Sequence, residues 1–409
     1  MEQLIQDLEF AVQWLPSSPQ KLGDITKGAA NHLLAKVYLA TCDFDKAIKA
    51  ATDVINGPYA LMTQRFGIDK DNRYRNIMWD LHRCENKNIT DNTETIYATV
   101  DRAEASPDTW WSNPGTNTMW IYVPEYWRVP DTEGKRACNW NTQDTLGLGN
   151  TLIRTNDFFH YKMWEDKTYS WENTPDLRRI TSNWIEMGDS IADIYCNVVG
   201  SPNFGEPLNK YWGAIDTIIS WMPWPYYKTY NPTPNYSKPH GGQGDFYIFR
   251  LAETYLLRAE AYYWKGQLGS AANDINKIRE RANAPLINAD DVTIDYIFDE
   301  RARELYTEEP RHSEMVRVAF IFGKLNKNGY QLTSLHEKNW YHDRIMRVNH
   351  FYFPTSRLYR RGEPATLNPH HFLWPIPQSV ITANTMGRIN QNTGYDGYEL
   401  NVEVLNSIP

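Results

Sequence analysis

Two stretches of the chain decide the fold: GAANHLLAKVYLATCDFDKAIKAATDVI at residues 28–55 and YIFRLAETYLLRAEAYYWKGQLGSAANDINKIRERANA at residues 247–284. In each stretch apolar residues recur at spacings of three and four, and a second amphipathic run follows a short break, which predicts two helices joined by a turn. Asp43 is expected to cap the second helix of the first pair, and Gly57-Pro58 to end it. Both stretches therefore predict helical hairpins.

The two hairpins share a pattern of small residues and tyrosine. The spacing is the same in the triplets Ala35, Tyr38, Ala47 and Ala259, Tyr262, Ala271. Small residues let two helices approach closely, and the tyrosine fills the space beside them. This is the spacing of tetratricopeptide repeats, although the usual Trp and Gly of that repeat are missing. The alternative is that the two helical hairpins are unrelated to this repeat.

A third helix pair is predicted over residues 291–322, interrupted by Pro310.

A long region of different character separates the two hairpins. Over residues 58–245 helical periodicity is weak and turn residues are dense, and one short strand is predicted at Thr95–Val100. We therefore expect a mainly α protein with a tetratricopeptide-like helical-hairpin scaffold and a long loop-rich insertion carrying little β structure. The expected organisation is a single domain over 1–409, with the scaffold at 1–57 and 246–323, the insertion at 58–245, and a loop-rich C-terminal part at 324–409 packing on the scaffold.

Composition narrows the possible functions. The 409 residues are 41% hydrophobic and 22% charged, which is ordinary for a globular protein. The net charge of −8 and the lack of a Lys/Arg-rich run argue against nucleic acid as a partner. No run approaches the 18 apolar residues of a spanning helix. The four cysteines have no metal-ligand spacing, and the sequence favours none of their three possible pairings.

Aromatic residues are the unusual feature. They make up 14% of the chain, and 12 of the 16 tryptophans lie between Trp79 and Trp224. Aromatic faces pack against the C–H groups of a sugar ring, while its hydroxyls need amide or carboxylate partners, and Asn is abundant here. The alternative is that about half of these rings only fill a loop-rich core. The ligand-binding candidates lie in two clusters within the insertion: Trp110, Trp111, Trp120, Tyr122, Trp127, Trp224 and Tyr226.

Signals for catalysis, metals and cofactors are weak. Glu300, Glu304 and Glu308 lie one helical turn apart, a spacing that a glycosidase could use. Arginines at 301, 303 and 311 are interleaved with them, so we expect structural ion pairs on packed helices. No motif for a metal, a nucleotide or another cofactor is present, and no catalytic residue is assigned.

The first fifteen residues, MEQLIQDLEFAVQWL, carry an amphipathic helical pattern. They contain neither a basic segment nor a continuous apolar segment, so they do not form a signal peptide. The apolar stripe predicts a packed helix whose partner lies upstream, and we expect the natural protein to be longer than this chain.

Segments along nearly the whole chain resemble the SusD/RagB family of glycan- and nutrient-binding outer-membrane lipoproteins. Seven segments match in the family's order: DLEFAVQWLP at 7–16, residues 28–55, ETIYATV at 94–100, PDLRR at 175–179, FRLAETYLLRAEAYYWKG at 249–266, ERARELYTEEPRHSEMVR at 300–317, and LWPIPQSVITAN at 373–384 with QNTGY at 391–395. The family's lipoprotein signal, its lipid-bearing cysteine and a helical N-terminal part of more than one hundred residues are absent here, and Glu314 stands where Asp is common.

The resemblance implies a function. It implies a non-catalytic protein of the outer-membrane surface, held by a lipid anchor missing from this chain, which binds oligosaccharides or other nutrients. The implied partner is a SusC-like TonB-dependent transporter, over which the protein sits as a lid. Two alternatives remain open: a glycoside hydrolase on a helical scaffold, and a peptide-binding tetratricopeptide-like scaffold.

Overall fold

The computed structural model describes residues 1–102, 115–188, 192–213, 215–232, 240–349, 351 and 366–403. The chain forms two compact units, Met1–Glu308 and Glu309–Pro409. The first unit holds the helical hairpins and the loop-rich insertion, and the second holds the C-terminal helices.

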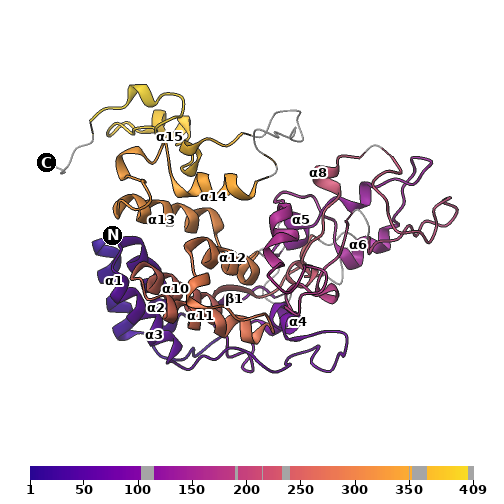
Figure 1. Ribbon diagram of the computed structural model, residues 1–409, viewed down its shortest axis with the longest axis horizontal. Helices are drawn as coiled ribbons and strands as arrows, with labels where there is room; N and C mark the ends of the chain where they lie inside the picture. The colour runs from indigo at the N-terminus through magenta and orange to yellow at the C-terminus, as the bar shows by residue number, and fades with distance from the viewer. Residues whose placement is uncertain are drawn as a thin grey trace. The chain divides into compact units, whose positions relative to one another are not determined.

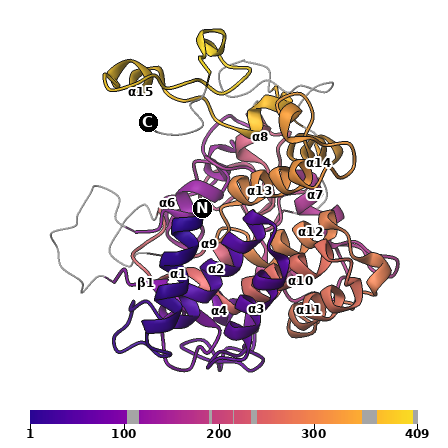
Figure 2. The ribbon, with the colours of Figure 1, turned by 90° about the vertical axis from the view of Figure 1, so that its left-hand side faces the viewer.

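The first unit is built on helices and one small sheet. Its long helices and strands are α1 (Glu2–Trp14), α2 (Lys27–Thr41), α3 (Phe44–Ile55), β1 (Thr95–Thr99), β2 (Phe246–Arg250), α10 (Leu251–Trp264), α11 (Leu268–Arg281) and α12 (Ile294–Leu305). Helix α2 packs against α1 and α3, and α10 packs against α3, α11 and α12. Figures 1 and 2 show the indigo N-terminal helices beside the orange α10 and α11, although the whole insertion separates them in sequence.

The shared small residues of the two hairpins lie where the helices meet. Ala35, Ala259 and Ala271 are fully buried, and Ala47 is 1% exposed. Side chains of this size allow the close approach that the tetratricopeptide-like spacing predicts. The mainly helical fold and its hairpin scaffold are therefore confirmed.

Local signals fix the hairpin turns. Asp43 caps α3 as predicted, since its carboxylate accepts a hydrogen bond from the Lys46 amide at 3.4 Å. Gly266 follows α10 with φ +74°, a conformation that glycine adopts without steric cost. Helix α3 thus begins after its predicted cap, and α10 is followed by a glycine that lets the chain turn into α11.

The start of the second hairpin differs from the prediction. Residues 246–250 form strand β2, which pairs antiparallel with β1 and places Ala98 opposite Tyr247 and Thr99 opposite Phe246. The helix begins only at Leu251. Aromatic and Ile residues favour a strand, and β1 supplies the partner, so pairing across the insertion overrides the helical pattern. The strand predicted at Thr95–Val100 is confirmed as β1.

The insertion contains short helices joined by turns. They are α4 (Ile77–His82), α5 (Thr118–Tyr122), α6 (Trp140–Leu146), α7 (Asp157–His160), α8 (Thr217–Ser220) and α9 (Tyr226–Thr229). In Figure 1, α5, α6 and α8 lie together, away from the hairpins α2–α3 and α10–α11. The insertion has apolar clusters of its own, one of them built around Tyr126, Met187, Leu208 and Trp224. The loops of the insertion therefore pack on hydrophobic clusters of their own, which hold their side chains in place.

The second unit contains α13 (Arg311–Lys324), α14 (Trp340–Val348) and α15 (Gln378–Ala383). Helix α13 packs against α14, with the rings of Phe322 and Trp340 6.1 Å apart. The predicted third pair is thus present as α12 and α13, but these helices belong to different compact units. Among the described helices, none is long and apolar enough to cross a membrane.

Candidate functional site

The predicted ligand-binding aromatics have different surroundings. Trp110 and Trp111 lie outside the described residues. Trp120 and Tyr122 are half-buried, and their rings contact His240 at 4.3 Å and Tyr306 at 5.4 Å between centroids. Burial raises the pKa of the Tyr122 phenol. Both rings therefore retain some exposed surface but are already packed on one side.

Trp127 is also half-buried. Its indole N–H donates to the Gly149 carbonyl at 3.0 Å, and its ring packs on the edge of the apolar cluster around Tyr126. The Arg128 guanidinium lies 4.9 Å from the ring centroid. The polar edge of this indole is therefore used within the protein.

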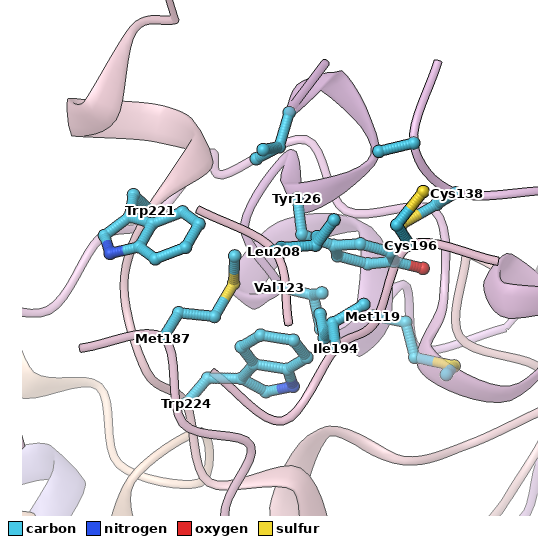
Figure 3. Close-up of a cluster of buried hydrophobic side chains, with 12 residues drawn as sticks. Met119, Val123, Tyr126, Cys138, Met187, Ile194, Cys196, Leu208, Trp221 and Trp224 are labelled. Carbon is cyan, nitrogen blue, oxygen red and sulfur yellow. The ribbon is translucent and has the colours of Figure 1, made fainter. Parts of the chain in front are cut away.

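The last two predicted residues, Trp224 and Tyr226, are buried. Trp224 is 1% exposed, and its backbone exchanges two 3.1 Å hydrogen bonds with Ile185. Its ring stacks on that of Tyr126, with the centroids 6.0 Å apart. Figure 3 shows both residues in one buried cluster. Tyr226 is 6% exposed and donates to the Thr145 carbonyl at 3.0 Å. Neither ring offers a free face, and the site proposed below does not include them.

A pocket of about 300 Å³ lies in the same loop-rich insertion. Most of its wall comes from residues 206–212, and Gly188, Ala192 and Trp221 line it from two other segments. Tyr211 is 76% exposed, Trp212 is half-buried and Trp221 is 8% exposed. None of these three residues is among the ligand-binding candidates predicted from the sequence. The pocket therefore combines, from two segments, three aromatic side chains that the sequence did not single out as binding residues.

A hairpin positions the pocket wall. The Cys196 amide donates to the Glu206 carbonyl at 2.9 Å, and the Leu208 amide donates to the Ile194 carbonyl at 2.7 Å. Leu208 is 2% exposed in the cluster of Figure 3, which anchors the end of the hairpin. The two arms of this hairpin are joined by an isolated antiparallel bridge between Tyr195 and Pro207, and the buried Leu208 holds the second arm on the core.

A local turn then presents Tyr211. The Asn209 side-chain oxygen accepts a hydrogen bond from the Tyr211 amide at 2.9 Å, and the Asn209 carbonyl accepts one from the Trp212 amide at 3.1 Å. Asn is favoured in such turns because its side chain mimics a backbone turn. The turn directs the tyrosine ring outward while Trp212 stays against the protein.

The polar groups of the pocket complement its rings. The indole N–H of Trp221 has no hydrogen-bond partner among the described residues. Figure 3 shows this nitrogen on the side of the ring away from the rest of the cluster. Glu206 adds a carboxylate and Asn209 an amide to the lining. Lys210 adds an ammonium group. The pocket thus offers aromatic faces beside both hydrogen-bond donors and acceptors.

The glutamates of α12 lie in a different environment. Glu300 is fully buried and contacts Arg178, Arg279 and Arg303, each at 2.8 Å. Burial alone would raise the pKa of its carboxyl, but the three guanidinium groups lower it well below its usual range. Glu304 is held in the same way by Arg178, Arg250 and Arg281.

The expected structural use of these glutamates is confirmed, with partly different partners. Of the arginines named from the sequence, only Arg303 contacts Glu300, while Arg301 contacts Glu253 at 3.1 Å and Arg311 contacts Glu309. The missed partners come from distant segments, including Arg178 of the PDLRR stretch and Arg250 of β2. Within the described residues, no group of three or more His, Cys, Asp or Glu side chains could hold a metal ion.

Comparisons with known proteins identify relatives of this chain. The model of the SusD family matches residues 86–395. The starch-binding protein SusD of Bacteroides thetaiotaomicron is 45% identical over 86 residues, a match that covers 21% of this chain and 14% of that relative. The matched part is therefore a small fraction of the relative's length.

Solved structures share the fold. Surface glycan-binding protein A from Bacteroides uniformis has a TM-score of 0.56 at 17% identity, over 96% of this chain and 68% of that one. Surface glycan-binding protein A from Bacteroides thetaiotaomicron has a TM-score of 0.57 at 17% identity, over 96% of this chain and 69% of that one. At this identity the likeness concerns the fold alone. Because the family model matches most of the chain, and the same scaffold recurs in these structures, the chain belongs to the SusD family.

Proposed function

We propose that this protein is a non-catalytic binder of oligosaccharides, and that the pocket formed by residues 206–212 and Trp221 is part of its binding site. The observation that carries the proposal is the pocket itself, which brings the exposed ring of Tyr211 and the half-buried ring of Trp212 together with the carboxylate of Glu206. Sugar rings present C–H faces that pack on aromatics and hydroxyls that pair with donors and acceptors. Family membership and the names of the relatives, which include starch-binding and glycan-binding proteins, support the same ligand class.

The proposal includes the place and partner that the family resemblance implies. The protein sits on the outer-membrane surface through a lipid anchor and passes its ligand to a SusC-like TonB-dependent transporter. Copurification of the two proteins from detergent-solubilised outer membranes tests this part. Recovery of the protein only from soluble fractions, without a transporter, would contradict it.

Titration calorimetry with a panel of soluble oligosaccharides tests the binding proposal. The panel includes α-glucan fragments because one relative is a starch-binding protein. We expect modest affinity, since a few stacking contacts leave only a few kcal/mol after ordering costs. Trp212→Ala and Tyr211→Ala should each weaken binding by about 1–3 kcal/mol, by analogy with base stacking on aromatics.

The matched control for Tyr211 is Tyr74→Ala. Tyr74 is also an exposed tyrosine of the insertion, at 68%, but it does not line the pocket. Its replacement should leave affinity unchanged. Equal binding by wild type and both pocket variants would exclude this pocket, whereas failure of every glycan in the panel would count against the ligand class itself.

The same samples separate the alternatives. Released reducing ends after incubation with the bound glycans would indicate a hydrolase. We expect no released reducing ends, because arginines surround Glu300 and Glu304 and neither carboxyl is available to a substrate. Binding of unstructured peptides in place of glycans would favour the helical scaffold as the site.

A further inference from the structure

Two of the four cysteines, Cys138 and Cys196, come together inside the loop-rich insertion. Both are thiols in the structure, with exposed fractions of 0% and 1%, and both belong to the same apolar cluster. Figure 3 shows their side chains next to each other, at the end of the cluster opposite Trp221. The sequence alone does not predict that the two cysteines lie together, because several turns of the chain separate them.

The backbone around the two cysteines holds them in place. The Asn197 amide donates to the Ala137 carbonyl at 3.0 Å, and the Asn139 amide donates to the side-chain oxygen of Asn197 at 2.7 Å. Residues on both sides of Cys138 are thus bonded to the immediate neighbour of Cys196. A disulfide requires Cα atoms about 4.4–6.8 Å apart, a separation typical of chain segments bonded in this way.

The remaining cysteines are placed differently. Cys42 is the half-buried C-cap of α2, and Cys84 lies in the turn after α4, where its thiol donates to the Glu85 carboxylate at 3.1 Å. Neither belongs to the cluster that holds Cys138 and Cys196. Of the pairings that the sequence left open, the structure favours a bond between Cys138 and Cys196 that leaves Cys42 and Cys84 outside it.

The pair is connected to the pocket wall. Cys196 lies on one arm of the hairpin whose other arm carries Glu206 and Leu208. Its amide donates to the Glu206 carbonyl at 2.9 Å, and its carbonyl accepts from the Gly205 amide at 2.8 Å. A covalent bond at Cys196 would therefore anchor the pocket-bearing hairpin to residues 137–139. This anchor adds to the buried side chain of Leu208.

We propose that Cys138 and Cys196 form a disulfide when the protein folds in the presence of a disulfide oxidant, and that this bond fixes the hairpin that carries the pocket wall. One thiolate attacks the oxidant's disulfide and releases one of its sulfurs as a thiol. The second cysteine then displaces the other sulfur from the mixed disulfide. The two cysteines lose two protons and two electrons, and the oxidant's disulfide is reduced to two thiols. The proposal does not depend on what the pocket binds.

The burial of the Cys138 thiol determines when the disulfide can form. Burial, together with the neighbouring Cys196, raises the pKa of the Cys138 thiol to about 12. In the folded protein this thiol is protonated and inaccessible, and a protonated thiol is a poor nucleophile. The bond therefore forms before the cluster closes, and the same burial afterwards protects it from reductants.

Thiol counting tests the bond. The protein is refolded in oxidised and reduced glutathione, denatured without reductant and alkylated with N-ethylmaleimide. We expect two alkylated thiols, Cys42 and Cys84, and a peptide in which Cys138 is linked to Cys196. Cys138→Ala and Cys196→Ala should each leave three reactive thiols, while Cys84→Ala should keep the linked peptide. Four alkylated thiols in the wild type, or a linkage through Cys42 or Cys84, would overturn the proposal.

Hydrogen exchange tests the anchoring. Amides of residues 194–208 should exchange faster in Cys138→Ala than in the oxidised wild type, whereas helix α3 should be unaffected. Cys138→Ala changes no residue of the hairpin itself, and the wild type with its disulfide reduced keeps the same packing, so a faster exchange shared by both reflects the lost bond. Identical exchange of the hairpin in both proteins would show that the bond, even if formed, does not fix the pocket wall.

Discussion

The indoles of Trp221 and Trp224 belong to the same apolar cluster but differ in their surroundings. Both nitrogens are buried and lack a partner among the described residues. Trp224 is enclosed at 1% exposure and stacks on Tyr126, whereas Trp221 lines the pocket. The ring of Trp221 can therefore contact a ligand through the atoms that line the pocket, whereas the ring of Trp224 has only a packing role.

Trp221→Phe should separate these roles. The substitution keeps an aromatic ring but removes part of the surface that lines the pocket, so we expect oligosaccharide affinity to fall by about 1 kcal/mol, roughly fivefold. The melting temperature should also fall, because the smaller ring leaves a void in a cluster where Trp221 is only 8% exposed. Trp224→Phe is the matched control and should leave affinity unchanged. Titration calorimetry measures the affinity of both variants, and thermal melts measure their stability. A fall in stability without a fall in affinity for Trp221→Phe would show that this residue is only part of the core.

Sequence periodicity predicted the helical elements well, because each hairpin carries its own apolar face and caps. Residues 28–55 are an example, with Asp43 capping α3 as expected. The strand at 246–250 was misassigned because its partner β1 lies on the far side of the insertion. Tyr211 and Trp212 were missed for a similar reason: two adjacent aromatics carry no local signal, and their pocket exists only where the 194–208 hairpin meets Trp221.

Enlarging a small buried side chain tests how tightly the helical hairpin α10–α11 is packed. Ala271 of α11 is fully buried where the second hairpin closes. Ala271→Leu adds three carbons to a tightly packed contact and should destabilise the first unit by about 1–3 kcal/mol. Asn273→Leu introduces the same side chain at an exposed position of the same helix and should be nearly neutral. Thermal melts compare the two; equal effects would show that the interface around Ala271 is not close-packed.

A buried network of charges ties the first unit together. Arg178 from the insertion, Arg250 of β2 and Arg281 of α11 all reach Glu304 of α12. Pairs buried in this way add little net stability, but removing one partner leaves a charge uncompensated, which is costly. Segments with no local attraction for one another are thereby held in one arrangement, and the insertion is fixed on the helical scaffold.

The pH dependence of stability follows from this network. The folded-state pKa values of Glu300, Glu304 and Glu308 are lowered by their arginine and lysine partners. The stability they contribute is therefore fully present above the unfolded pKa of about 4.3 and is lost as the pH falls towards the folded values. The melting temperature should decrease steadily below about pH 5, as recorded by calorimetric scans.

Glu300→Gln provides the comparison for that prediction. It should lower the melting temperature at pH 7, since three arginines lose their charged partner. It should also show a smaller further decrease between pH 5 and pH 3, because one of the titrating groups is gone. A wild-type melting temperature that stays constant or rises over this interval would refute the role of the network.

The most direct measurement is a crystal structure of the protein with an oligosaccharide that binds in the calorimetric panel. We predict density for a sugar ring in the pocket, stacked on Tyr211 or Trp212, with a sugar hydroxyl within about 3.2 Å of a side-chain oxygen of Glu206 or Asn209. A sugar bound elsewhere with this pocket empty would contradict the account.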